Sequence, residues 1–115
     1  MLPKEYKLKK DNDFKRVFEK GRYSQSDVVK IKFLKNNLKI SRFAFLVGLK
    51  TSKKAATRNA IRRKMEEIIR LKINQIKIGF DVAVMVNPEI SKKDYHEIEE
   101  SLIVLLQKAD LLARS

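Results

Sequence analysis

The chain has 115 residues, of which 43% are hydrophobic and 36% are charged, and its 27 Lys and Arg against 14 Asp and Glu give a formal net charge of +13. This length and apolar content suffice for a core without cross-links, so we expect residues 1–115 to form one domain. The absence of Cys excludes disulfides, thiolate catalysis and Cys-ligated zinc.

A charge excess of this size predicts a polyanionic partner, either nucleic acid or an anionic membrane surface. A membrane-surface helix would carry bulky aromatic side chains opposite its basic face, and the most basic segment of this chain has none. No apolar run approaches the roughly 20 residues that span a bilayer, and the N-terminus lacks the apolar stretch of a signal peptide. We therefore expect a cytoplasmic nucleic-acid-binding protein with no membrane partner.

The N-terminal residues 2–10 are basic and lack periodicity, which predicts an arm. The acidic cluster at residues 11–13 is a helix start, and Gly21 is expected to follow the C-cap of a short first helix. Phe14 and Phe18 lie one turn apart on the same side of this helix. Two interpretations stay open for these rings: both belong to the core, or at least one borders a groove in which bases of single-stranded RNA stack.

Two strands are predicted next. In residues 28–34, apolar side chains alternate with Lys30 and Lys32, which gives one apolar face and one basic face. The basic face is either solvated or part of an RNA-binding groove. A turn at residues 36–37 leads to a more apolar strand at 41–49, and so short a connection predicts that the two strands are antiparallel neighbours.

The most basic segment, residues 50–72, holds nine Lys or Arg against two Glu, a net +7. Its periodicity predicts a loop followed by a helix with Thr57 as N-cap, ending near residues 73–75, with one apolar stripe and one basic stripe. Because clustered cations repel one another unless they face a polyanion, we interpret it as the RNA-binding element. The candidate RNA-binding residues are Lys50, Lys53, Lys54, Arg58, Asn59, Arg62, Arg63 and Arg70.

The C-terminal part predicts a strand and a helix. Residues 80–86 are almost continuously apolar, as in a strand that is covered on both faces. Ser91 and Asp94 are spaced as a capping box for a last helix that extends to about Leu112. His96 lies among polar residues and is expected at the surface.

No catalytic constellation can be assembled from these residues. The three Gly residues are not spaced for a phosphate-binding loop, and the single His has no nucleophile or orienting partner. Asp81 and Glu89 are the only acids near the apolar strand, which is too few for a two-metal nuclease site. The sequence therefore predicts a binding protein that has no catalytic residue and no bound cofactor.

A resemblance to a known family rests mainly on residues 54–63, which read Lys-Ala-Ala-Thr-Arg-Asn-Ala-Ile-Arg-Arg and are followed by Glu67 and Arg70. This run resembles the pattern Lys-Ala-x-x-Arg-Asn-x-x-(Lys or Arg)-Arg on the second helix of the bacterial ribonuclease P protein component. The likeness extends over nearly the whole chain through residues 8–21 and 42–45, while the last strand and helix agree only in kind.

The resemblance implies an α/β fold, specifically a small α+β two-layer sandwich of the ribosomal-protein type. Its element order is α-β-β-β-α-β-α, with a central mixed sheet and a left-handed crossover against the usual right-handed rule. It also implies a single RNA-binding domain that joins a large catalytic RNA. That ribonucleoprotein removes the 5′ leader of precursor tRNA by Mg²⁺-assisted hydrolysis in the RNA, and no obligate protein partner is implied.

Carried over by position, the candidate residues of the basic segment would contact the catalytic RNA, while Phe14, Phe18, Lys30 and Lys32 would line the cleft for the leader. Three departures from the family pattern bear on this assignment. Ala60 and Glu66 stand where the family usually has cations, which thins the positive charge. Lys32 stands where a Tyr is often found, which suggests a phosphate contact in place of stacking.

Two rival functions remain for the sequence alone. A structural RNA-binding protein of the ribosomal type could use the same basic helix. A DNA-binding module is less favoured, because no second helix is placed to complete a helix-turn-helix.

Overall fold

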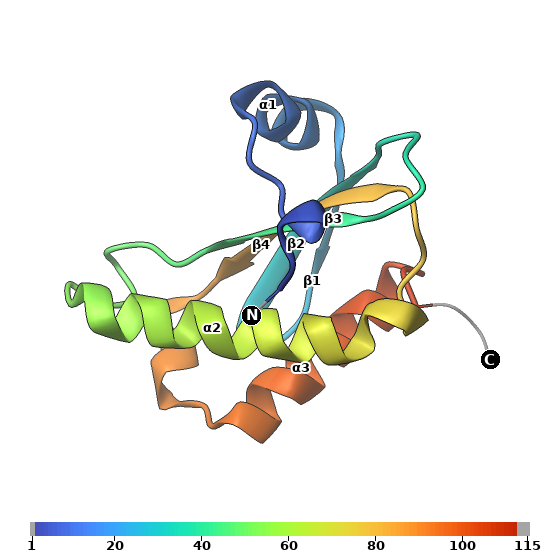
Figure 1. The fold of residues 1–115 in the computed structure, drawn as a ribbon. Helices are drawn as coiled ribbons and strands as arrows, with labels where there is room; N and C mark the ends of the chain where they lie inside the picture. The colour runs from blue at the N-terminus through green and yellow to red at the C-terminus, as the bar shows by residue number, and fades with distance from the viewer. Residues whose placement is uncertain (1, 113–115) are drawn as a thin grey trace.

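The computed structural model describes residues 2–112 and arranges helices on both faces of a mixed sheet (Figure 1). The helices and strands of the described residues follow the order α1 (Asp11–Lys20), β1 (Arg22–Gln25), β2 (Val29–Lys35), β3 (Arg42–Leu46), α2 (Ala55–Lys72), β4 (Phe80–Val86) and α3 (Tyr95–Lys108). Short 3-10 turns occur at η1 (Lys4–Tyr6), η2 (Ile73–Gln75) and η3 (Pro88–Lys92). The predicted element order is confirmed.

The strand order in the sheet is β1-β2-β4-β3. β4 pairs antiparallel with β2 and parallel with β3, and α2 connects the parallel pair. The mixed sheet is thus confirmed, whereas the left hand of this crossover stays a prediction. The prediction that β2 and β3 are neighbours was wrong, because β4 lies between them.

The connection between β2 and β3 explains why they are not paired. The backbone N–H of Asn36 donates to the Gly79 carbonyl at 2.8 Å, and the Asn36 side-chain amide donates to Asp81 at 2.9 Å. The connection therefore crosses the start of β4 and is bonded to it, so the short loop does not close a hairpin.

The main core lies between one face of the sheet and the inner sides of α2 and α3 (Figure 1). Alternate strand residues and the apolar helix stripes meet there, as the two-layer sandwich requires. The principal buried side chains are Val29, Ile31, Phe33, Phe43, Phe45, Val82, Val84, Ile61, Met65, Ile68, Ile69, Ile98, Leu102, Leu105 and Leu106.

The opposite face of the sheet is covered in part by α1. Val17 of α1 is fully buried there and packs with Leu8, Ala44 and Ala83. Ala44 and Ala83 are small, which lets the helix approach the strands closely. A part of this face is therefore left open beside α1.

The N-terminal residues are held against the sheet and do not form a free arm. Leu2 is buried in the main core, and the backbone N–H of Leu8 donates to the Phe43 carbonyl at 2.8 Å. Lys7 lies 3.6 Å from the carboxylate of Glu66, which is buried on α2. The backbone of this segment and the Lys7 side chain are therefore held in place.

Two helix starts differ from the sequence prediction. α2 begins one turn early, with Lys54 at the N-cap in place of Thr57, and the hydroxyl of Ser52 accepts from the Lys54 N–H at 3.1 Å. The capping box of α3 consists of Asp94 and Glu97, whereas Ser91 lies in η3.

Two helix ends also differ. Gly21 has φ −72°, so it does not adopt the left-handed conformation expected after a C-cap. α3 ends at Lys108, and Leu112 instead pairs with Ile76 in an isolated bridge.

An ion-pair network fixes α1 over the sheet. The guanidinium of Arg42 on β3 donates to both carboxylate oxygens of Asp81 on β4, at 2.8 and 2.7 Å, and lies 3.4 Å from Asp13 on α1. The hydrogen bond to Asp81 raises the pKa of Arg42. Three elements are therefore joined through one side chain.

Replacing Gly21 with Ala should destabilise the protein. A Cβ at this position would lie 2.3 Å from the Val17 carbonyl oxygen and 3.1 Å from that of Phe33, both backbone atoms that cannot move aside cheaply. We expect a loss of roughly 1–3 kcal/mol in the free energy of unfolding, as for other overpacked sites. Gly48→Ala is the matched control, because its Cβ would meet nothing within 4 Å. Urea unfolding measures both, and equal stability of the two variants would refute the close-approach explanation.

Candidate nucleic-acid interface

The predicted basic residues lie on the outer side of α2 and on the loop before it. The apolar stripe of the helix is buried in the core, as predicted. Six of the eight candidates are exposed: Lys50, Lys53, Lys54, Asn59, Arg63 and Arg70. Arg58 and Arg62 are half-buried. We call these eight residues the basic helix surface.

Arg58 and Arg62 already have hydrogen-bond partners within the protein. Arg58 donates to the Ser52 carbonyl at 2.9 Å, which ties the loop to the first turn of α2. Arg62 donates to the side-chain oxygen of Asn59 at 2.5 Å. Since a guanidinium has five N–H donors, both residues keep donors for a phosphate. Arg58 also positions the loop that carries Lys50 and Lys53.

Arg70 stands apart from the other candidates. It donates to both carboxylate oxygens of Glu67 at 3.0 and 2.6 Å, which raises the pKa of Arg70 and lowers the pKa of Glu67. Twelve residues separate it from Arg58, about 18 Å along a helix. Arg70 therefore lies at the far end of the surface, and its charge is partly neutralised by Glu67, whereas that of Arg63 is not neutralised by any side chain that the structure describes.

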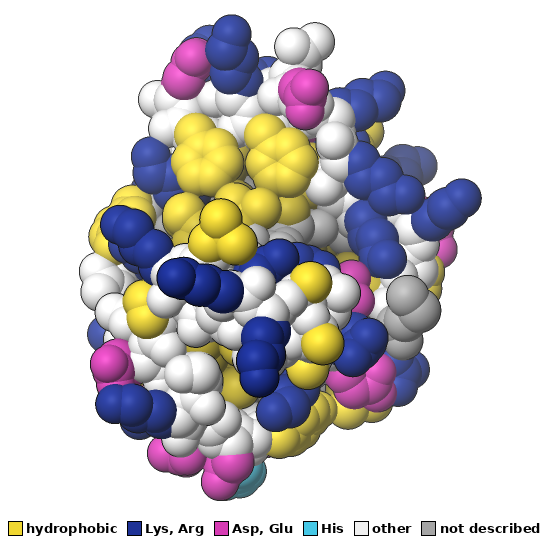
Figure 2. All heavy atoms as spheres, turned by 90° about the vertical axis from the view of Figure 1, so that its left-hand side faces the viewer, with side chains coloured by type: hydrophobic (Ala, Val, Ile, Leu, Met, Phe, Trp, Pro, Cys, Tyr) yellow, Lys and Arg dark blue, Asp and Glu magenta, His cyan; other side chains and the backbone are white. Residues whose placement is uncertain are grey.

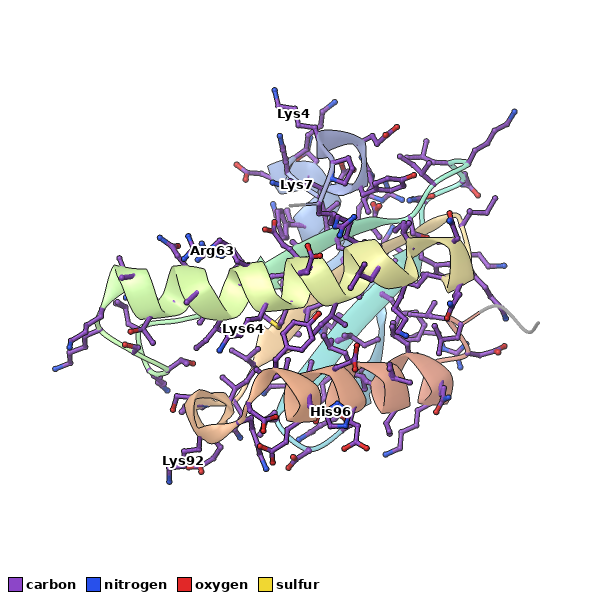
Figure 3. All side chains as sticks on the ribbon, turned by 60° about the horizontal axis from the view of Figure 1, so that its bottom comes forward. Lys4, Lys7, Arg63, Lys64, Lys92 and His96 are labelled. Carbon is purple, nitrogen blue, oxygen red and sulfur yellow. The ribbon has the colours of Figure 1, made fainter. Side chains whose placement is uncertain are left out.

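The structure adds cations that the sequence prediction did not include. Figure 3 shows Lys4 and Lys7 on the same side of α2 as Arg63, whereas Lys64 points to the other side, towards α3. The N-terminal lysines therefore extend the basic helix surface. Their basic segment was visible in the sequence, but its position beside α2 depends on the packing of Leu2 and Leu8.

The family departures have different structural consequences. Glu66 is buried and faces Lys7, so its carboxylate is compensated inside the protein and does not point at a ligand. Ala60 is half-buried beside the exposed residues, and its one consequence is that the cation usual in the family is missing there.

The four cleft candidates lie on α1 and on the α1 side of β2, and among them Lys32 contacts Phe18. Phe18 is 37% exposed and Phe14 is half-buried, so neither ring is closed off in the core. Lys30 is paired with Met85 and Lys32 with Ala83, which places both lysines on the α1 side of the sheet. We call Phe14, Phe18, Lys30 and Lys32 the cleft residues.

Lys32 has an internal role. Its ammonium donates to the Phe18 carbonyl at 2.9 Å and lies 5.8 Å from the centre of the Phe18 ring. It thereby satisfies a carbonyl at the end of α1 and holds the aromatic ring beside the strand. The structure favours this positioning role over the phosphate contact suggested by the sequence.

Lys30 links the cleft residues to the basic loop. It borders a depression of about 410 Å³ that Lys50, Leu49, Val86 and Pro88 also line. Figure 2 shows hydrophobic side chains gathered in a hollow below the helix at the top of the molecule, with Lys and Arg side chains along its lower border. Apolar and cationic groups are thus continuous from α1 to the loop before α2.

Neither a metal centre nor a membrane span is found among residues 2–112. These residues contain no group of three His, Asp or Glu side chains that could hold a metal ion. No helix within them is long and apolar enough to cross a bilayer.

Comparisons with known proteins by sequence and by structure point to the same family. The Ribonuclease P family model matches residues 2–110. The ribonuclease P protein component of Alkaliphilus metalliredigens is 34% identical over 107 residues, which cover 93% of this chain and 96% of the relative. That of a Pseudanabaena species is 34% identical over 113 residues, which cover 97% of each.

Solved structures that resemble this chain belong to the same family. The RNase P protein from Thermotoga maritima, in complex with 1-(4-fluorophenyl)-2-thiourea, superposes with a TM-score of 0.82 at 31% identity, covering 89% of this chain and 98% of that one. A mutant RNase P protein from Staphylococcus aureus superposes with a TM-score of 0.87 at 25% identity, covering 94% and 91%. The ribosomal-type and DNA-binding alternatives are set aside. The chain therefore belongs to the ribonuclease P protein component family, and it is the protein subunit of a ribonucleoprotein endoribonuclease involved in tRNA 5′-end maturation.

Proposed function

We propose that this subunit binds the ribonuclease P RNA through the basic helix surface and the 5′ leader of precursor tRNA through the cleft residues, acting in the cytoplasm as one RNA-binding domain. The observation that carries the proposal is the continuity of the two surfaces. Open aromatic rings on α1 lead through Lys30 to the basic loop at Lys50.

Charge and exposure support the assignment of the basic helix surface. Lys50, Lys53, Lys54 and Arg63 are exposed and have no ion-pair partner among the residues that the structure describes. Exposed cations without an ion-pair partner contribute most to the free energy of RNA binding, because each phosphate contact releases counterions from the RNA. Arg63 lies on α2 and Lys54 at its N-cap, and Arg58 ties the loop that carries Lys50 and Lys53 to the first turn of the helix. The backbone that carries these cations is therefore ordered before binding.

The cleft residues suit an unpaired strand. Bases of single-stranded RNA stack on aromatic side chains, and a nearby cation contacts the backbone. Phe18, held by Lys32, provides a ring face, and Lys30 provides the cation one step further along β2. A double helix presents no free base faces, so the cleft favours the leader over paired regions of tRNA.

We place the bond chemistry in the RNA partner, with Mg²⁺ bound there. The protein alone should then cleave no RNA, and added to its cognate RNA it should lower the Mg²⁺ concentration needed for cleavage, because its cations replace part of the screening. Cleavage rates across a Mg²⁺ titration, with and without protein, measure this. Metal-dependent cleavage by RNA-free protein, purified to exclude other nucleases, would overturn the assignment.

Neutralising Arg63 should weaken binding to the catalytic RNA. Its side chain is exposed and lies on the outer side of α2 (Figure 3). Arg63→Ala should reduce the slope of log affinity against log salt by about one charge and leave the fold unchanged. Lys92→Ala removes the same charge from η3, away from the basic helix surface, and should have no effect. Equal slopes for both variants and the wild type would contradict the assignment.

Removing the Phe18 ring should weaken the binding of precursor tRNA but not that of mature tRNA. Phe18→Ala in the holoenzyme should reduce precursor tRNA affinity by roughly 1–3 kcal/mol, the range of one lost base stack. Mature tRNA has no leader and should bind as before. Equilibrium binding of both tRNAs gives the comparison.

Tyr95→Ala is the matched control for that experiment. Tyr95 has the same 37% exposure as Phe18 but lies on α3, across the sheet. It should leave both affinities unchanged. Equal weakening of precursor and mature tRNA by Phe18→Ala, or a loss of thermal stability alone, would show that the ring serves packing.

A further inference from the structure

A wide depression lies outside the surfaces discussed so far. It has a volume of about 1020 Å³ and sits at the end of the sheet where β2 ends and β4 begins, opposite the end near Lys50. Its walls include η2 and the residues just after α3, which lie together near the C-terminal end of the chain in Figure 1. We call it the η2 pocket.

Cations and aromatic rings alternate across the floor of the η2 pocket. Arg22 of β1 is paired with Phe33 of β2, and Lys35 of β2 is paired with Phe80 of β4. Strand alternation places all four side chains on the same face of the sheet. The rings of Phe33 and Phe80 meet edge to face at 6.3 Å, and the two cations lie beside them.

The cations and part of the apolar surface of the η2 pocket have no partner within the described structure. Arg22 and Lys35 are exposed and form no ion pair with any side chain that the structure describes. The one acid in the lining, Asp110, is 3.1 Å from Lys77. Phe80 is partly buried, and Ile78 in the wall is 65% exposed. The pocket therefore combines open apolar surface with two uncompensated positive charges.

The position of the η2 pocket connects it to the basic helix surface. Asn74 in its wall belongs to η2, the turn that follows α2 directly, and comes four residues after Arg70 and eleven after Arg63. At helical spacing it lies near the continuation of the row that Arg63 and Arg70 form on α2. A strand that follows this row from the loop at Lys50 reaches the pocket at its end. The exposed amide of Asn74 can both donate to and accept from a base edge.

We propose that the η2 pocket binds an unpaired nucleotide of the same RNA that lies along α2, with the base against Phe80 and its phosphates beside Arg22 and Lys35. This inference rests on the proposed contact between the basic helix surface and the catalytic RNA. Its volume is at the upper end of the roughly 300–1,000 Å³ range of small-molecule sites, enough for a nucleotide. An acidic peptide would use the cations but not the alternation of cations and ring faces.

Binding of a free nucleotide tests the pocket without the catalytic RNA. Adenosine 5′-monophosphate added to isotope-labelled protein should shift the amide signals of residues 74–80 and of Arg22 and Lys35. Phe80→Leu keeps an apolar side chain against Phe33 but removes the ring, and should weaken this binding by roughly 5- to 150-fold, the equivalent of one lost stack. Shifts confined to α1 and β2, or pocket shifts induced by a polyglutamate peptide and not by the nucleotide, would overturn the proposal.

Binding of the whole RNA tests the connection to α2. Arg22→Ala/Lys35→Ala should reduce the salt slope for the ribonuclease P RNA by about two charges, whereas Lys92→Ala/Lys93→Ala, which removes two cations near η3, should leave it unchanged. If Arg63→Ala lowers the slope while the pocket variant matches its control, RNA binding by the η2 pocket is refuted and RNA binding by the basic helix surface is supported. If the pocket variant lowers the slope while Arg63→Ala does not, the pocket binds RNA and the proposed path along α2 is wrong.

Discussion

The bidentate pair between Arg42 and Asp81 is the contact on which the arrangement of the binding surfaces depends. Asp81 is almost fully buried, and its carboxylate accepts from the Arg42 guanidinium and from the Asn36 amide. Removing one partner of such a pair costs roughly 3–5 kcal/mol, because the other charge is left uncompensated. Through Asp13, the same guanidinium also holds α1 against the sheet. The edge strand, the β2–β3 connection and the helix that carries the aromatic rings are thus fixed together.

The two faces of the sheet differ, one forming a structural side and the other a binding side. α2 and α3 close one face of the sheet with a continuous apolar core, while α1 covers the other face only in part. Small side chains at Ala44 and Ala83 let α1 sit close at one end and leave the rest of the face open. α2 belongs to both sides, because its apolar stripe is buried and its cations face outwards. The rigidity of the core is thereby transmitted to a row of charges.

The sequence predicted the features that depend on local pattern. Helical periodicity and charge located α2 and its exposed residues, and alternation in β2 placed Lys30 and Lys32 on one face. Strand order was not predictable in this way, because β4 is inserted between β2 and β3 through contacts of Asn36 with residues more than 40 positions away. The partners of Lys32 and Glu66 likewise follow from tertiary packing. A lysine in a basic strand looks available for phosphate until the Phe18 carbonyl is placed beside it.

The central claim is that the leader lies between α1 and the open face of the sheet. Photo-crosslinking tests it most directly, with a single 4-thiouridine at successive leader positions of precursor tRNA bound to the intact holoenzyme. Mass spectrometry of the digested protein identifies the crosslinked peptides. The account predicts adducts on α1 and β2, around Phe18 and Lys30. An excess of unlabelled precursor tRNA should remove these adducts, whereas mature tRNA should compete for them poorly. Adducts concentrated on α3, with none on α1 or β2, would contradict it.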